Sequence, residues 1–249
     1  EKIVFKDLSF TYPDTGIKAI RGLNFNVSSG QTLGIIGNTG SGKSTIAQLM
    51  LRMYDIPEGL LAYDGIPVNK IDLETLRSRI SYVPQDVFLF SDSISNNIRF
   101  GKNDATTEQV YKAAKQASIY EEINRFPEAF ETMVGERGVT LSGGQKQRIS
   151  IARALVREPG IVIFDDCLSA VDGKTEQDIL SSLNTYLEGR TAVIITHRIF
   201  SLLQFDKIVV MNEGRIVEMG THSELLAING LYTSMYNRQQ EQDKKPGES

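Results

Sequence analysis

This sequence lacks long apolar runs and an excess of basic residues. No apolar stretch in the 249 residues approaches the ~20 residues that cross a bilayer, and the start EKIVFKDLSF has no signal-peptide core. We therefore expect this chain by itself to be soluble. Because it begins without Met and almost within a predicted strand, we also expect a domain cut from a longer polypeptide.

Net charge and cysteine content argue against nucleic-acid-binding proteins and against proteins held together by disulfide bonds. The 27 Lys and Arg against 31 Asp and Glu leave a formal net charge of -4, so we expect no nucleic-acid partner. The single cysteine, Cys167, cannot form an internal disulfide and fits a reduced, cytosolic setting or a small core residue. Only the tail 239–249 is polar throughout, and we expect it to be disordered.

Hydrophobic spacing predicts a sheet with helices. Apolar residues alternate with period two at 3–10 and 23–27, which predicts antiparallel strands. Between 86 and 160 helical patterns replace the β-branched runs, which predicts an inserted helical subdomain. Short apolar runs separated by helical patterns predict a mostly parallel sheet, and they occupy residues 31–37, 161–165, 191–196 and 207–211. Capping boxes are expected at Thr106 with Gln109 and at Thr221 with Glu224.

One glycine-rich loop joins the apolar run at 31–37 to a predicted helix. Its sequence, GNTGSGKST, matches G-x4-G-K-[ST] in the strand-loop-helix context that binds phosphate. The glycines let backbone N–H groups surround a phosphate, Lys43 reaches the β- and γ-phosphates, and Ser44 can ligate Mg²⁺. An ordinary glycine-rich loop is the alternative. The expected nucleotide-binding residues are Gly37, Asn38, Thr39, Gly40, Ser41, Gly42, Lys43, Ser44 and Thr45.

Two further segments carry candidate chemistry. Asp165 stands at the carboxyl end of a predicted buried strand, where parallel sheets bind ligands, and it can hold Mg²⁺ unless it is only a turn cap. In LSGGQKQR, Ser142 can cap a helix whose first turn holds Gly143 and Gly144, which gives a second set of N–H groups suited to phosphate. The chain thus has two phosphate-facing helix starts but one lysine and one metal-binding strand.

The ordered motifs GNTGSGKS, YVPQD, LSGGQKQR, IVIFDD and ITHR closely resemble the nucleotide-binding domain of ABC transporters. The resemblance covers nearly the whole chain. It implies an α/β fold over residues 1–238, with a P-loop NTPase core of mostly parallel sheet, an antiparallel β subdomain and the helical subdomain at 86–160. It also implies ATP and Mg²⁺ as cofactors and a place at the cytoplasmic face of a membrane.

The resemblance accounts for the second helix start. It implies that two such domains pair head to tail, so that the signature of one closes over the ATP of the other. The signature residues implied are Ser142, Gly143, Gly144 and Gln145. We expect the transmembrane domain on the same full-length polypeptide, and the segment TMVGERG at 132–138 resembles the exporter branch, where it senses that domain.

Other roles follow from the same resemblance. Tyr12 is expected to stack on adenine, although it could be a surface aromatic at a strand end. Gln85 is implied to reach Mg²⁺ and the attacking water, and His197 to contact the γ-phosphate; each could instead be a polar turn or capping residue. The segment SAVD at 169–172 resembles the loop that couples the two ATP sites.

Asp166 departs from the family pattern, in which this position is usually a Glu that polarises the attacking water. Asp is shorter by one methylene, and a misplacement of about 1 Å can cost on the order of 100-fold in rate. We therefore predict tight binding and slow hydrolysis of ATP, and favour one half of a heterodimeric exporter over a homodimer in which Asp166 serves.

Rival classes fit less well. A chromosome-organising or DNA-repair ATP switch would interrupt the domain with a long coiled coil, and the sequence has no heptad run of that length. A separate importer motor is disfavoured by TMVGERG, and a P-loop kinase would leave LSGGQ unexplained. No pattern in the residues identifies a transported substrate.

Overall fold

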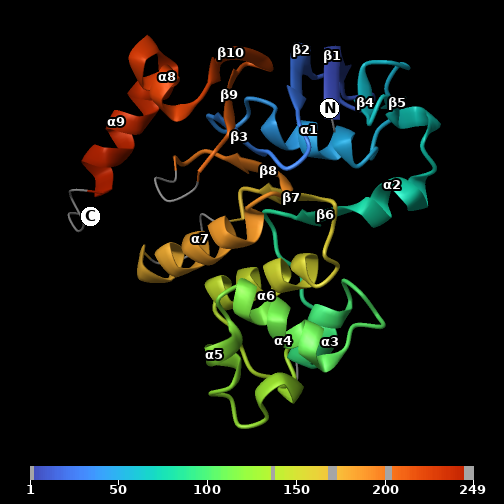
Figure 1. Ribbon diagram of the computed structural model, residues 1–249, viewed down its shortest axis with the longest axis vertical. Helices are drawn as coiled ribbons and strands as arrows, with labels where there is room; N and C mark the ends of the chain where they lie inside the picture. Colours follow the sequence, from blue (N-terminus) through green and yellow to red (C-terminus); the bar gives the residue numbers. More distant parts are fainter. Residues whose placement is uncertain (1–2, 136–137, 168–172, 200–203, 244–249) are drawn as a thin grey trace. The chain divides into compact units, whose positions relative to one another are not determined.

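The computed structural model describes residues 3–135, 138–167, 173–199 and 204–243 (Figure 1). The chain forms two compact units: a core unit of residues 1–77 and 189–249, and a helical unit of residues 78–188. The core unit contains β1 (Ile3–Thr11), β2 (Lys18–Val27), β3 (Thr32–Gly37), α1 (Lys43–Met50), β4 (Leu61–Tyr63), β5 (Ile66–Pro67), a 3-10 turn (Val68–Lys70), β8 (Thr191–Thr196), β9 (Lys207–Asn212), β10 (Arg215–Gly220), α8 (His222–Ile228) and α9 (Leu231–Asp243).

The helical unit has a separate set of elements. It contains β6 (Ile80–Val83), α3 (Ile94–Arg99), α4 (Thr107–Gln116), α5 (Tyr120–Ile123), a 3-10 turn (Ala129–Glu131), α6 (Gly143–Leu155), β7 (Ile161–Asp165) and α7 (Gly173–Leu187). Helix α2 (Leu73–Arg79) runs across the boundary between the two units. The helical unit contains the whole insertion predicted at 86–160, together with two strands and α7.

One sheet of the core unit is antiparallel, as the period-two alternation predicts. Its strand order is β2-β1-β4-β5, and β1 pairs with both β2 and β4. Phe5 and Phe25 face each other in the ladder, and their rings stack with centroids 4.2 Å apart. Cross-strand aromatic pairs of this kind stabilise one face of a sheet.

The other strands of the core unit lie in the order β10-β9-β3-β8. Strand β3 pairs in parallel with both β8 and β9, and every residue of β3 and β8 is buried, which explains the continuous apolar runs. Strand β10 pairs antiparallel with β9 through the turn after Asn212. Because β3, β8 and β9 are parallel, their carboxyl ends share one edge, and that edge positions the loop after β3.

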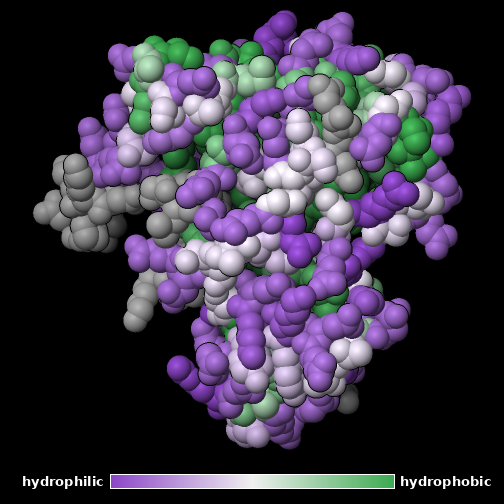
Figure 2. All heavy atoms as spheres, viewed as in Figure 1, coloured by the Kyte–Doolittle hydropathy of each residue, from purple (hydrophilic) through white to green (hydrophobic). Residues whose placement is uncertain are grey.

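In the helical unit, β6 and β7 form a parallel pair in which Val83 faces Phe164. The predicted capping box of α4 is confirmed: the Thr106 hydroxyl accepts a hydrogen bond from the Gln109 N–H, and the Gln109 side chain accepts one from the Thr106 N–H. Figure 2 shows one face of the molecule, on which hydrophilic residues predominate and hydrophobic residues form separate groups. Within the described residues, no helix combines the length and the apolar character that a bilayer crossing demands.

The end of the chain differs from the expectation of a disordered tail after residue 238. Helix α9 continues to Asp243, and the Gln239 side chain is bonded to the backbone of Ile199. Polarity alone predicts disorder, but Gln and Glu are good helix formers and a polar side chain can be fixed by a tertiary hydrogen bond. Residues 244–249 lie outside the described part of the chain.

Candidate nucleotide-binding and signature sites

The phosphate-type loop of the core unit begins where β3 ends. A Cβ atom on Gly37 would lie 2.4 Å from the Met211 carbonyl oxygen of β9, so only glycine fits there. Gly42, just before α1, has a φ of +95°, and a Cβ there would lie 2.5 Å from the Ala19 carbonyl oxygen. The glycines of the motif thus hold the loop close to two neighbouring backbone segments, while the loop residues Asn38, Thr39 and Gly40 are exposed.

Lys43 is the first residue of α1 and is almost buried. Its ammonium group donates hydrogen bonds to the carbonyl oxygens of Gly37 (2.8 Å) and Asn38 (2.7 Å). These two bonds hold the Lys43 ammonium group against the loop that precedes α1. Helix α1 has no side-chain cap, so the N–H groups of its first turn and the Lys43 ammonium place positive charge at one point, which suits an anion.

Ser44 and Thr45 differ sharply in their surroundings. Ser44 is exposed, whereas Thr45 is 4% exposed and its hydroxyl lies 2.8 Å from the Tyr12 hydroxyl. The Tyr12 hydroxyl also donates to the Gln48 side chain at 2.8 Å, so both contacts fix Tyr12 against α1. Tyr12 therefore lies beside the helix of the phosphate loop, and its stacking on adenine stays a prediction.

His197 reaches the same sheet edge as the phosphate loop. The last paired residues of β3 and β8 are Ile36 and Thr196, so the next residues along the two strands are Gly37 and His197. The Thr196 hydroxyl accepts a hydrogen bond from the Arg198 N–H at 3.0 Å, which turns the chain after the strand, and the His197 side chain is exposed. The core unit thus brings together Tyr12, the residues from Gly37 to Thr45, and His197.

In the helical unit, the carboxyl ends of β6 and β7 also share an edge. Asp165 ends β7, is 2% exposed, and accepts a hydrogen bond from the Tyr82 hydroxyl at 2.9 Å. Burial and the Asp165 carboxylate raise the pKa of Tyr82, so the phenol keeps the proton that it donates. The Val83–Phe164 pairing places exposed Gln85 just beyond this edge, where Asp165 and Asp166 also lie.

Asp166 lies in the left-handed region, with a φ of 47°. This conformation costs most non-glycine residues about 1–2 kcal/mol, but Asp and Asn adopt it more readily than Glu. The next residue, Cys167, is buried, and burial with the nearby Asp165 carboxylate raises the pKa of its thiol. Cys167 is therefore an inert core residue, one of the two interpretations expected from the sequence.

The signature segment forms the start of α6. The Ser142 hydroxyl accepts from the Gln145 N–H (3.2 Å), and the Ser142 N–H donates to the Gln145 side chain (2.9 Å), a complete capping box. A Cβ on Gly143 would meet no other atom within 4 Å. The helix start predicted at Ser142 is confirmed, and its first glycine faces open space within the described residues.

A network of charged side chains supports this helix start. Arg148, which is almost buried, forms a two-point ion pair with Glu122, at 2.5 Å and 3.0 Å, and also donates to the Ser118 carbonyl oxygen. The Gln145 amide donates to the same Glu122 carboxylate at 3.2 Å. Burial alone would raise the pKa of Glu122, but the hydrogen bonds from Arg148 and Gln145 outweigh it and lower that pKa overall.

Sequence reasoning missed Tyr82 and Glu122, because each acts through a contact with a residue far away in the chain and no local motif marks it. Two expected segments fall wholly or partly outside the described residues. The segment SAVD lies within residues 168–172, and Glu136 and Arg137 belong to TMVGERG.

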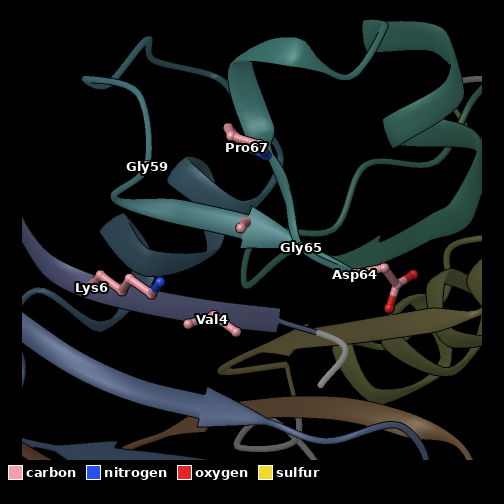
Figure 3. Close-up of a pocket in the computed structure, with 7 residues that line it drawn as sticks. Val4, Lys6, Gly59, Asp64, Gly65 and Pro67 are labelled. Atoms are coloured by element: carbon pink, nitrogen blue, oxygen red, sulfur yellow. The ribbon is translucent and has the colours of Figure 1, made fainter.

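Cavity size does not identify the site. A hollow of about 620 Å³ lies on the antiparallel sheet (Figure 3), and none of the predicted nucleotide-binding residues lines it. Figure 3 shows Lys6 on β1 and Asp64 after β4 on different sides of this hollow. A second hollow, of about 700 Å³, lies in the helical unit and is lined by Glu122, Arg148 and neighbouring polar residues. The predicted chemistry depends on loops at strand ends and not on an enclosed cavity.

The buried strand, close-packed glycine loop and lysine-bearing helix of the core unit define a P-loop nucleotide-binding protein. A family model described as "ABC transporter" matches residues 20–169. The chain belongs to the ABC transporter family.

Relatives and a solved structure agree with this assignment. The chain is 50% identical over 238 residues to a probable multidrug resistance ABC transporter ATP-binding/permease protein of Bacillus subtilis, YheI, covering 96% of this chain and 41% of that protein. It is 48% identical over 231 residues to the multidrug resistance-like ATP-binding protein MdlA of Escherichia coli, covering 93% of this chain and 39% of that protein. The structure of a bacterial Atm1-family ABC exporter with ATP bound matches at a TM-score of 0.89 and 42% identity, covering 96% of this chain and 41% of that chain. The chain therefore spans about two fifths of the length of these relatives.

Proposed function

We propose that this chain is the ATP-driven motor of a membrane exporter and works at the cytoplasmic face of the membrane as a head-to-tail pair of such domains. One observation carries the proposal: the same chain has an uncapped, lysine-bearing helix start after β3 and a second, capped helix start whose first glycine faces open space. The open turn suits a phosphate that belongs to another molecule. Relatives named as multidrug resistance transporters and an Atm1-family exporter support the transport role.

Each expected residue then has a distinct task. Lys43 exchanges its bonds to the loop carbonyls for bonds to the β- and γ-phosphates, and Tyr12 stacks on adenine. His197 contacts the γ-phosphate, and the Ser142–Gln145 turn is donated to the ATP of the partner domain. Because phosphoryl transfer needs mainly positioning and charge stabilisation, these contacts supply most of what the reaction requires.

The donor set also fits Mg²⁺, a cation that takes oxygen ligands from one or two carboxylates, substrate phosphates and water. Ser44 offers an exposed hydroxyl, Asp165 a carboxylate held in place by Tyr82, and Gln85 an exposed amide. The resemblance to the family, and not a measured arrangement of the two units, assigns the ion to these three residues. When bound, Mg²⁺ neutralises charge on the phosphates.

Asp166 makes this chain the slow half of a heterodimeric exporter in our proposal. Its carboxylate is one methylene shorter than the usual Glu, and a general base must come within about 2.6 to 3.2 Å of the proton it takes. The left-handed backbone conformation at position 166 favours Asp over Glu. Asp is therefore suited to the backbone at this position, although its carboxylate extends less far toward the attacking water. Binding of ATP does not use this side chain.

Two variants at position 166, compared with wild type, test the proposal. We expect wild type and Asp166→Asn to hydrolyse ATP at similarly slow rates and Asp166→Glu to be about 10- to 100-fold faster, with similar affinity for a non-hydrolysable analogue and Mg²⁺. If Asp166→Asn is far slower than wild type, Asp166 is a working base and the proposal of a slow half is wrong. If the analogue does not bind, or binds without pairing either two copies of this domain or this domain with an unlike mate, the motor itself is excluded.

A further inference from the structure

Gln239 of α9 holds the backbone just after His197. Its amide oxygen accepts a hydrogen bond from the Ile199 N–H at 2.8 Å, and its amide nitrogen donates to the Ile199 carbonyl oxygen at 2.9 Å. Ile199 is buried, so its backbone groups need protein partners. The paired bonds fix both the position and the orientation of this residue.

The residues on both sides of His197 are fixed by hydrogen bonds. On one side, Thr196 pairs with Ile36 in the parallel ladder, and its hydroxyl accepts from the Arg198 N–H. On the other side, Ile199 is bonded to Gln239 and packs in a hydrophobic cluster that also contains Ile36. The backbone that carries the histidine therefore depends on β8 before it and on α9 after it.

Helix α9 is itself anchored, so Gln239 has a defined place. The Glu218 carboxylate of β10 accepts hydrogen bonds from the N–H groups of Leu231 and Tyr232, the first residues of α9. The Tyr232 side chain is buried in the same cluster as Ile199, and its hydroxyl lies 2.6 Å from the His222 ring nitrogen Nδ1. Gln239 follows about two turns further along this helix.

We propose that Gln239 is a positioning residue for His197, so that the C-terminal helix sets the rate of ATP hydrolysis from outside the nucleotide site. The proposal rests on the proposed function, in which His197 contacts the γ-phosphate. The Gln239 amide is bonded to the Ile199 backbone, which lies outside the phosphate loop, so we expect loss of the amide to displace the histidine while the contacts of the phosphate loop, which dominate nucleotide binding, stay in place. A displacement of about 1 Å at a catalytic group can cost on the order of 100-fold in rate.

The test compares Gln239→Leu with Gln242→Leu, a change of the same chemistry at an exposed position of the same helix. Both are made in the Asp166→Glu chain, which gives a measurable rate if the site is slow. We expect Gln239→Leu to lower kcat about 10-fold, with KM and affinity for a non-hydrolysable ATP analogue within about twofold of the parent. Gln242→Leu should match the parent in all three. A loss of analogue affinity that parallels the loss of kcat would overturn the proposal, because it indicates a general disturbance of the fold.

A double variant separates this inference from the proposed function. If Gln239 acts through His197, Gln239→Leu combined with His197→Ala should be no slower than His197→Ala alone. Additive losses would show that Gln239 acts by another route and would reject the inference. If His197→Ala itself leaves the rate unchanged, the proposed role of His197 is wrong, whatever Gln239 does.

Discussion

The starts of α1 and α6 carry glycines for opposite reasons. Before α1, Gly42 is packed against the Ala19 carbonyl oxygen and has a left-handed backbone, and the helix has no side-chain cap. At α6, Ser142 and Gln145 satisfy the helix end within the chain, and a Cβ on Gly143 would meet nothing among the described residues. In the first case the missing side chain makes room for the protein's own backbone. In the second it leaves a surface clear, which suits a ligand brought by another molecule.

The largest predicted effect comes from adding the same methyl group at the two starts. Gly42→Ala should lower the free energy of unfolding by roughly 3 kcal/mol, because a left-handed alanine adds about 1–2 kcal/mol to a backbone clash, and it should abolish binding of a non-hydrolysable ATP analogue. Gly143→Ala should change the free energy of unfolding by less than about 0.5 kcal/mol. Chemical denaturation and analogue titration measure both.

Rates of ATP hydrolysis give a second test of the comparison between the two helix starts. Made in the Asp166→Glu chain, Gly143→Ala should bind the analogue normally but hydrolyse ATP more slowly than that parent in the paired state, because its methyl group enters the space kept for the partner's phosphate. Turnover equal to that of the parent would contradict the view that this open surface is functional. Normal stability and binding for Gly42→Ala would show that the phosphate loop tolerates a shift that the structure does not suggest.

The ion pair behind the signature gives a smaller predicted effect. Glu122→Gln should lower the free energy of unfolding by about 2 kcal/mol, since it leaves nearly buried Arg148 without its charged partner while Glu122 is itself partly exposed. The exposed pair between Lys70 and Glu58 is the matched control, and Glu58→Gln should cost less than about 0.5 kcal/mol. Denaturant titration of both variants at neutral pH measures the difference.

The pH dependence of the same variant checks the cause. The pKa of Glu122 is lowered in the folded state, so its pairing contributes fully above the unfolded value of about 4.3 and is lost as the pH falls through the lower folded value. The stability difference between wild type and Glu122→Gln should therefore shrink below about pH 4. A difference that stays constant into acid would mean that the carboxylate charge is not the cause.

The sequence predicts the helices and strands of this domain far better than it predicts the side chains that hold the functional residues in place. The runs that form β3, β7, β8 and β9 are continuously apolar because both faces of the strands are buried, and the loop at 37–45 has a spacing that few other functions need. Strands β4, β5 and β6 have between two and four residues each, and they escape prediction because they are too short to show a period. Periodicity needs length to be visible.

The supporting residues have no local signal at all. Tyr82 meets Asp165 and Glu122 meets Arg148 across long stretches of chain, and only folding brings each pair together. Gln239 lies in a segment whose composition predicts disorder, because composition describes how a segment interacts with water and not with a neighbouring backbone. Conversely, the capping boxes at the starts of α4, α6 and α8 are local patterns, and the structure confirms all three helix starts.

Those caps allow the smallest and most selective prediction. Ser142→Ala and Thr106→Ala each remove the hydroxyl of a complete capping box in the helical unit, so each should lower the free energy of unfolding by about 1 kcal/mol. Made in the Asp166→Glu chain, only Ser142→Ala should also slow hydrolysis in the paired state, because only that hydroxyl lies beside an open glycine in the proposed signature. Equal stability losses with equal activity losses would mean that the capped start of α6 is merely structural. A selective loss for Ser142→Ala separates the role of the cap in folding from its role toward the partner's ATP.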